Sequence, residues 1–386
     1  MNLENRLENA IPPHIYQRPP YKTASVLFKE LKIKLGISDE DARDNLLTLN
    51  ANENPYPPIL DKHEDLKSDL NLYPPLQDAQ LINLFSRLFP IAPETILLCD
   101  GVDAGLGWLV RSLCEPFKDT ILICPPTFPK YRTVAELHQV NVAAVPLTRN
   151  NEKLELDIDG ILAALDSSYQ KQQPIKILFI TTPNNPCGHA EDENKLSKML
   201  ERIDRDYPLT FIVLDRAYWG FYQVPSTILN SIDCSFLIQT FTVSKLYSLA
   251  GIRLGALSMN PKLIDYVIKL APTDPISEAT KKLALEALSP DKIPLYEARA
   301  QEIITERAKF ISRVKTLPFI QDVLHSDANF IAFKVNDATD FMKHLIENGI
   351  LLRDVSHLIG EGYVRITLST PENNEKIIEI FESYDK

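Results

Sequence analysis

The chain has few glycines, few cysteines and no long apolar run. Glycine accounts for 12 of the 386 residues, so glycine-rich phosphate loops of the dinucleotide-binding kind are few at most. The cysteines number five, and no two of them form a C-x-x-C pair. A disulfide framework is not expected in a chain of this length, so we predict reduced thiols and a cytoplasmic location.

An excess of positive charge is also missing. Acidic residues outnumber basic residues by 52 to 41, which gives a net charge of -11. Because nucleic acids and anionic membranes attract basic surfaces, we expect neither as a partner. No stretch approaches the ~18 apolar residues of a transmembrane helix, and the first residues do not follow the pattern of a secretory signal.

The composition is otherwise that of a globular protein, with 45% hydrophobic and 24% charged residues. The length favours two or three domains. We predict an N-terminal arm and helix over residues 1–49, a large domain over 50–272 and a small α+β domain over 273–386. The small domain would begin with a long helical stretch from Glu278 to Lys315, interrupted near Ser289–Pro294, and continue with short strands.

Short apolar runs alternate with longer helical patterns between residues 95 and 260. This alternation predicts an α/β fold, with a mostly parallel central sheet that helices bury on both faces. In such a sheet, ligands bind at the carboxyl ends of the strands. The runs are TILLCD, DTILICPP, VNVAAVPL, IKILFITT, TFIVLD, SFLIQTF and IRLGALSM.

Two motifs follow predicted strands and carry ionisable groups. In TVSKLYSLAGIRLG (242–255), Lys245 could condense with an aldehyde while Ser244 and Arg253 hold a phosphate. In FIVLDRAYWGF (211–221), Asp215 could keep a pyridine nitrogen protonated, and Tyr218 could reach the same pocket. The alternatives are an exposed loop lysine and an aspartate that caps the next helix.

Two further motifs predict a turn and an anion site. In ITTPNNPCGH (180–189), prolines and a glycine indicate a stiff turn that offers the amide of Asn185, although it could be a turn alone. In LLCDGVDAGLGWLVRSL (97–113), Gly101 would lead into a helix whose first amides, near Val102 and Asp103, can bind a phosphate. We interpret Gly105 and Gly107 as close-packing positions within that helix.

The four motifs, in this order at strand ends, resemble the aspartate-aminotransferase superfamily, the fold-type-I pyridoxal 5'-phosphate (PLP) enzymes. Within it the chain is most similar to the histidinol-phosphate aminotransferases. The resemblance runs from about Tyr21 to Thr370 and implies PLP as the cofactor and a homodimer. The more discriminating segments are LNANENPYPP, LYPPLQ, CEPFKDTILICPPTFPKY, SDANFIAF, GILLRD and YVRITLST.

The resemblance also implies roles for the cofactor residues. Lys245 would bind the cofactor aldehyde and then move a proton at the substrate α-carbon, and Asp215 would pair with the pyridinium nitrogen. Asn185 and Tyr218 would hydrogen-bond the ring oxygen. The remaining residues would stack on the ring or hold the phosphate: Phe128, Val102, Asp103, Ser244, Arg253 and, across the dimer interface, Tyr73.

The implied reaction is transamination between L-glutamate and imidazole-acetol phosphate, which gives 2-oxoglutarate and L-histidinol phosphate on the route to histidine. Arg365 would grip the glutamate α-carboxylate, as its planar fork suits a carboxylate. Tyr21, Asn52 and Arg353 would face the substrate, with Tyr21 and Arg353 as candidates for its phosphate. For Arg353 and Arg365 the alternative is a surface ion pair.

Several residues depart from the family pattern. Arg216 stands at a usually acidic position and Ala104 at a usual glutamate, and the others are Pro57, Pro129, Lys130 and Cys187. These departures leave two alternatives open. One is a PLP enzyme with another substrate, such as an aromatic aminotransferase or a threonine-phosphate decarboxylase; the other is a non-catalytic protein of this fold. The seven histidines show no metal-binding spacing, so no metal is expected.

Overall fold

A seven-stranded sheet forms the centre of the computed structural model, which describes residues 47–56, 59, 74–75, 77–222, 236–272 and 274–384 together with Ile33 and Gly36. The strand order is β2-β10-β9-β8-β7-β3-β4, and only β10 runs antiparallel to its neighbours. The predicted α/β fold is confirmed, because each of the seven apolar runs forms one strand. The strands are β2 (Ile96–Cys99), β3 (Thr120–Ile123), β4 (Asn141–Ala144), β7 (Ile175–Thr181), β8 (Phe211–Asp215), β9 (Leu237–Thr242) and β10 (Gly255–Ser258).

Alternate side chains of the central strands enter two different cores. In β7, Ile177 and Phe179 pack on one face, while Leu178 and Ile180 pack on the other. The first face is covered by α6 (Val102–Leu113), α7 (Lys130–Leu137) and α10 (Pro261–Val267). The second face is covered by α8 (Ile158–Gln170) and α9 (Glu193–Asp206). Since both faces are buried, these strands are continuous apolar runs rather than alternating ones.

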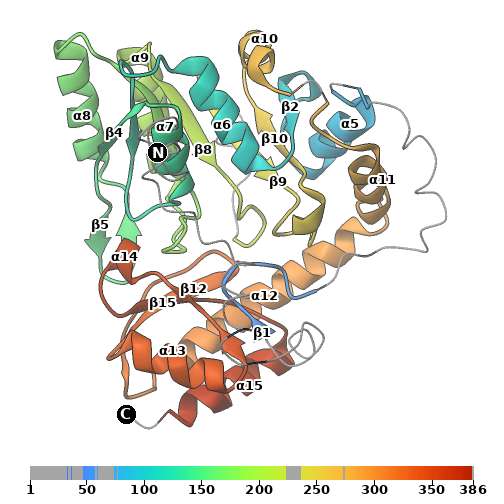
Figure 1. The fold of residues 1–386 in the computed structure, drawn as a ribbon, viewed down its shortest axis with the longest axis vertical. Helices are drawn as coiled ribbons and strands as arrows, with labels where there is room; N and C mark the ends of the chain where they lie inside the picture. Colours follow the sequence, from blue (N-terminus) through green and yellow to red (C-terminus); the bar gives the residue numbers. More distant parts are fainter. Residues whose placement is uncertain are drawn as a thin grey trace, which may run out of the picture.

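A second, antiparallel sheet of four strands has the order β11-β12-β15-β14. A third core joins it and its helices to one end of the large sheet. In Figure 1 the small sheet, α13 and α15 lie below the large sheet, and α12 runs diagonally from beside α11 down to the small sheet and α15. The strands of the small sheet are β11 (Ile320–Val323), β12 (Phe330–Val335), β14 (Arg353–Asp354) and β15 (Tyr363–Thr367). The helices of this part of the molecule are α5 (Ala79–Leu88), α11 (Glu278–Ala287), α12 (Ile293–Val314), α13 (Ala338–Glu347), α14 (Ser356–Ile359) and α15 (Pro371–Glu382).

Two further short pairings complete the strands: one connects distant segments and the other is a local hairpin. β1 (Leu47–Thr48) pairs in parallel with β13 (Ile350–Leu351), and β5 (Thr148–Asn150) forms a hairpin with β6 (Lys153–Glu155). The long helix expected after residue 272 is two helices, α11 and α12, as its interruption predicted. The domain boundaries themselves stay a prediction. Across the described ranges, no helix combines the length and apolarity needed to cross a membrane.

The two glycines predicted to pack closely inside α6 differ from each other. A Cβ at Gly105 would lie 3.0 Å from the Leu257 side chain and 3.2 Å from the Cys99 sulfur, so close packing is correct there. A Cβ at Gly107 would meet no described atom of the chain within 4 Å. The interpretation of Gly107 was therefore wrong, because its face of the helix is only half-buried.

Candidate active site

A cavity of about 1120 Å³ is lined by residues at the strand ends of the large sheet, by residues 50–52, and by residues 351–355, 357–358 and Arg365 near the small sheet. It contains every predicted site residue that the structure describes, twelve in number. Tyr21 and Tyr73 lie outside the described residues. The twelve are Asn52, Val102, Asp103, Phe128, Asn185, Asp215, Tyr218, Ser244, Lys245, Arg253, Arg353 and Arg365. Residues that are far apart in the sequence thus meet at the carboxyl ends of the strands, where ligands are expected to bind in such a sheet.

Asp215 is the last residue of β8 and is only 3% exposed. Its carboxylate accepts hydrogen bonds from the Tyr131 hydroxyl at 2.6 Å, the Thr240 hydroxyl at 2.9 Å and the Ala217 amide at 3.0 Å. Burial raises the pKa of Asp215, and these three hydrogen bonds oppose the increase. The Ala217 bond is of the capping kind, but the two hydroxyls fix the carboxylate at the cavity wall.

Tyr131 is a site residue that the sequence did not reveal. It lies on α7, is fully buried, and stacks on Phe179 with ring centroids 4.8 Å apart. Its hydroxyl also lies 2.6 Å from Thr181 Oγ1. The phenol therefore holds Asp215 in place from behind the cavity wall. A helical pattern places Tyr131 on the buried face of α7, but no local signal says that it reaches β8.

Tyr131→Phe is expected to lower kcat by about 10-fold, because a buried carboxylate that loses a short hydrogen bond is less firmly held in its ionised form. The free energy of unfolding should fall by about 1–2 kcal/mol. Steady-state kinetics and urea unfolding measure the two effects. Tyr266→Phe, at a ring that is 62% exposed, is the matched control. A stability loss with unchanged kcat would give Tyr131 a purely structural role.

Lys245 follows β9 and points into the protein. Its Nζ donates a hydrogen bond to the Ala51 carbonyl at 3.0 Å, and Asn54 Nδ2 donates to the Lys245 carbonyl at 3.0 Å. Burial, and next the charge of Arg365, lower the pKa of Lys245 to about 8, against smaller opposing effects of acidic neighbours. Lys245 is therefore not an exposed loop lysine, and its amine is poised for nucleophilic chemistry near neutral pH.

Chemical labelling of the cofactor-free protein should show this lowered pKa. With a pKa of about 8, about a tenth of the Lys245 amine is unprotonated at pH 7. We expect acylation of Lys245, followed by mass spectrometry, to rise with pH to a half-maximum near 8. Ordinary exposed lysines follow a midpoint near ~10.4. A Lys245 midpoint at that higher value would show that burial does not depress its pKa.

A hydrogen-bonded group connects Tyr218 to Arg365 across the cavity. The Tyr218 hydroxyl accepts from Asn52 Nδ2 at 2.9 Å and from Asn185 Nδ2 at 3.1 Å. Arg365 donates to Asn185 Oδ1 at 2.6 Å and to the Asn50 carbonyl at 3.0 Å. Burial raises the pKa of Tyr218 to about 12, so its phenol is neutral and can donate its own hydrogen.

Two guanidinium groups lie on paired strands of the small sheet. Arg353 of β14 is directly opposite Arg365 of β15 in the antiparallel register, and both line the cavity. Arg365 is 7% exposed, and its guanidinium lies 5.2 Å from the centre of the Phe330 ring. Arg365 is therefore not a surface residue, and half-buried Arg353 also faces the cavity. The pair makes this wall attractive to anions.

The start of α6 forms an anion cradle. Gly101 has φ 88°, no side chain caps the helix, and a Cβ at Gly101 would lie 2.5 Å from Arg253 Nη2. Glycine at this position lets the guanidinium approach the first amides of α6. The Ser244 hydroxyl, which accepts a hydrogen bond from Thr242 Oγ1 at 2.9 Å, lies on the same wall. Together with Lys245 and Asp215, this cradle fits a phosphorylated pyridine aldehyde.

Most departures from the family pattern lie outside the cavity wall. Arg216 is 2% exposed, lies 3.4 Å from Glu193, and has its guanidinium 5.0 Å from the centre of the Trp219 ring. It is thus a buried ion-pair residue that does not line the cavity. Ala104, Lys130 and Cys187 do not line the cavity, Pro129 does, and Pro57 lies outside the described residues.

Comparisons with known proteins agree with this geometry. The family model for aminotransferase class I and II matches residues 44–381. The histidinol-phosphate aminotransferase of Shigella flexneri serotype 5b is 32% identical over 86% of this chain and 89% of its own.

Solved structures show the same fold. Histidinol-phosphate aminotransferase from Sinorhizobium meliloti, in complex with pyridoxal-5'-phosphate, has a TM-score of 0.78 at 20% identity, over 97% of this chain and 98% of its own. An aspartate aminotransferase from Thermus thermophilus has a TM-score of 0.77 at 18% identity, over 97% and 99%. The family assignment supports PLP as the cofactor and an enzyme rather than an inert protein of this fold. The chain belongs to the aminotransferase class I and II family.

Proposed function

We propose that this aminotransferase uses PLP to transfer the amine of L-glutamate to imidazole-acetol phosphate, which yields 2-oxoglutarate and L-histidinol phosphate in histidine biosynthesis. One observation carries the proposal: a single cavity contains a lysine amine, a buried carboxylate, a phosphate cradle and two further guanidinium groups. The choice of substrate rests on the relative at 32% identity, whose name states that activity.

When bound, PLP would supply a cationic ring that withdraws electrons from the substrate α-carbon. Lys245 would hold the cofactor and then accept and return the α-carbon proton, a role that suits an amine with a pKa of about 8. Asp215, fixed by Tyr131 and Thr240, would keep the ring nitrogen protonated. The Tyr218 hydroxyl would donate a hydrogen bond to the ring oxygen.

The two arginines on paired strands would recognise the two substrates in turn. Glutamate carries an α-carboxylate that a planar guanidinium can bind in a bidentate manner, and Arg365 is the buried, oriented candidate. Histidinol phosphate lacks that carboxylate but has a phosphate at its other end. Arg353 on the neighbouring strand is positioned to favour such an anion over an uncharged side chain.

Arg353→Gln tests this assignment of the phosphate. We expect kcat/KM for histidinol phosphate to fall by about 10- to 100-fold, the effect of one charge-assisted contact. Turnover of phenylpyruvate, which has no phosphate, should change by less than about 3-fold. An equal loss with both compounds would show that Arg353 does not select the phosphate.

A competition assay tests the reaction itself. Purified enzyme would receive glutamate with imidazole-acetol phosphate, and in parallel phenylpyruvate or phosphothreonine. Preferred turnover of imidazole-acetol phosphate is the expected result. No turnover of that compound, with turnover of phenylpyruvate or decarboxylation of phosphothreonine, would replace the proposed substrate by one of the alternatives.

We also propose a homodimer and a cytoplasmic location. The four described cysteines, Cys99, Cys114, Cys124 and Cys187, are all free and buried, which suits a reducing compartment. Sedimentation equilibrium measures the assembly directly. A monomer that remains fully active would contradict the dimer and the role of Tyr73 across its interface.

A further inference from the structure

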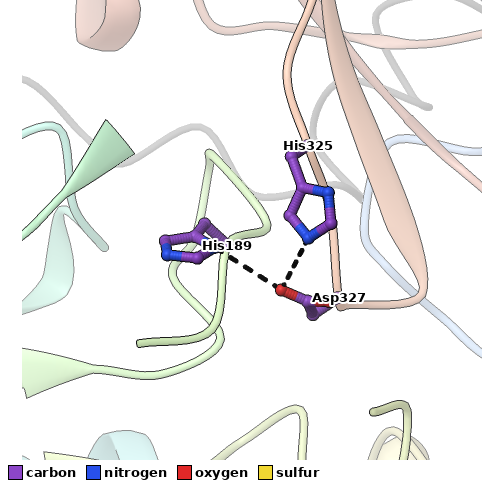
Figure 2. A group of neighbouring side chains, drawn as sticks. All are labelled: His189, His325 and Asp327. Carbon is purple, nitrogen blue, oxygen red and sulfur yellow. Dashed lines mark hydrogen bonds and ion pairs between the residues drawn. The ribbon is translucent and has the colours of Figure 1, made fainter. Parts of the chain in front are cut away.

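A second cavity, of about 640 Å³, contains a group of metal-ligand side chains that the transamination does not use. Figure 2 shows His189, His325 and Asp327 pointing toward one another. His189 lies in the turn after β7, whereas His325 and Asp327 lie between β11 and β12. In the part of the chain that the structure describes, these three are the group able to share one metal ion. Their distance in the sequence explains why histidine spacing predicted no metal.

The three ligand atoms are close to the spacing of a metal site. They all lie within 4.8 Å of one another. His325 Nε2 is 3.1 Å from Asp327 Oδ2, and His189 Nδ1 is 3.5 Å from the same oxygen. In a tetrahedral zinc site with bonds of ~2.0–2.2 Å, the ligand atoms are about 3.3–3.6 Å apart. Small side-chain movements would therefore bring all three atoms to coordination distance.

His189 is the strongest indication of a ligand. It is 5% exposed, and its buried Nδ1 makes no full hydrogen bond within the described part of the chain; its contact there is Asp327 Oδ2 at 3.5 Å. A buried polar atom in that state is costly unless something binds it. On the other side of the ring, Nε2 lies 3.8 Å from Glu155 Oε1. A carboxylate there would take the Nε2 hydrogen and leave the Nδ1 lone pair for a metal, as in many metal-binding histidines.

We propose that His189 Nδ1, His325 Nε2 and Asp327 Oδ2 bind one divalent transition-metal ion of the zinc class, with water as the fourth ligand. Two imidazoles and one carboxylate favour zinc, cobalt or nickel over magnesium and calcium, which prefer oxygen ligands. The open cavity gives the ion and its water access. The cations Lys153, Lys195 and Arg307 also line this cavity, but Glu155, Glu191 and Glu193 offset their charge.

The ion would hold together two segments, the turn after β7 and the loop between β11 and β12, and hydrogen bonds already join this loop to that turn and to the β5–β6 hairpin. The Asp327 amide donates to the Gly188 carbonyl at 2.7 Å, and the His325 amide donates to the Glu152 carbonyl at 2.8 Å. Gly188 lies in the same turn as Asn185, which bonds Tyr218 and Arg365 in the catalytic cavity. The ion would therefore link a turn of the large sheet, which also carries Asn185, to a loop of the small sheet.

Metal titration of the PLP-saturated enzyme, after treatment with chelator and dialysis, tests the proposal. We expect one Zn²⁺ or Co²⁺ per chain, visible Co²⁺ absorption of a site with nitrogen and oxygen ligands, and a rise of several degrees in Tm with Zn²⁺. His325→Gln is the main variant, because its side chain is 39% exposed and its loss should spare the fold. Asp327→Asn is the second, and His138→Gln is the control.

Loss of binding and of the Tm shift in His325→Gln and Asp327→Asn, with both kept in His138→Gln, would support the site. Stoichiometric binding that survives in His325→Gln, or Co²⁺ absorption typical of thiolate ligands, would overturn it. Absence of stoichiometric binding to the wild-type enzyme would also overturn it and leave a hydrogen-bonded His–Asp–His group. Because metal content and Tm are read without turnover, none of these outcomes depends on the proposed substrate.

Discussion

Lys245→Ala is expected to abolish transamination, with a loss of at least about 10⁴-fold in kcat. The reason is that one amine both holds the cofactor and moves the proton, so its removal takes away nucleophile and base together. The phosphate cradle at the start of α6 and Asp215 do not involve Lys245, so cofactor should still bind noncovalently. Turnover with glutamate, and absorbance of the bound cofactor, measure the two effects.

Lys262→Ala, at an exposed lysine on α10, is the matched control and should keep full activity. Turnover by Lys245→Ala within about 10-fold of the wild-type rate would show that another group supplies the base, since general bases contribute ~10²-fold or more. That result would refute the role of Lys245.

Asp215→Asn should lower kcat by about 10²- to 10³-fold, the cost of losing one oriented charge in a buried site. An amide cannot keep a pyridine nitrogen protonated, although it can keep several of the hydrogen bonds to Tyr131, Thr240 and Ala217. The free energy of unfolding should change by less than about 2 kcal/mol, because burial already disfavours the ionised form. Kinetics and urea unfolding separate the two.

Asp100→Asn provides the control for this substitution. Asp100 follows β2 as Asp215 ends β8, but it is exposed and does not line the cavity. Its replacement should leave kcat unchanged. If Asp215→Asn retained a near-normal rate, the residue would be only a cap for the Ala217 amide.

The pattern of apolar residues was enough to predict the large sheet. All seven strands lie within the predicted apolar runs, because the central strands of a sheet that is buried on both faces carry mostly apolar side chains. The antiparallel direction of β10 and the pairing of β1 with β13 were not predictable. Direction and pairing depend on contacts between segments that are distant in the sequence.

The sequence predicted those site residues that carry an ionisable side chain at or just after the end of an apolar strand. Asp215 ends the apolar strand β8 and Lys245 lies three residues after the end of β9, so the expectation that ligands bind at the carboxyl ends of the strands places them together. Tyr131, Thr240 and Asn54 were missed, because each acts through a contact with a distant segment. The group of His189 and His325 was missed for the same reason.

Borohydride reduction of the PLP-loaded enzyme, followed by peptide mapping, tests the central claim most directly. Reduction fixes the cofactor to whichever amine holds it. The account predicts a single pyridoxyl adduct on Lys245, in the peptide that follows β9. An adduct on any other lysine, or none on an enzyme that transaminates, would contradict it.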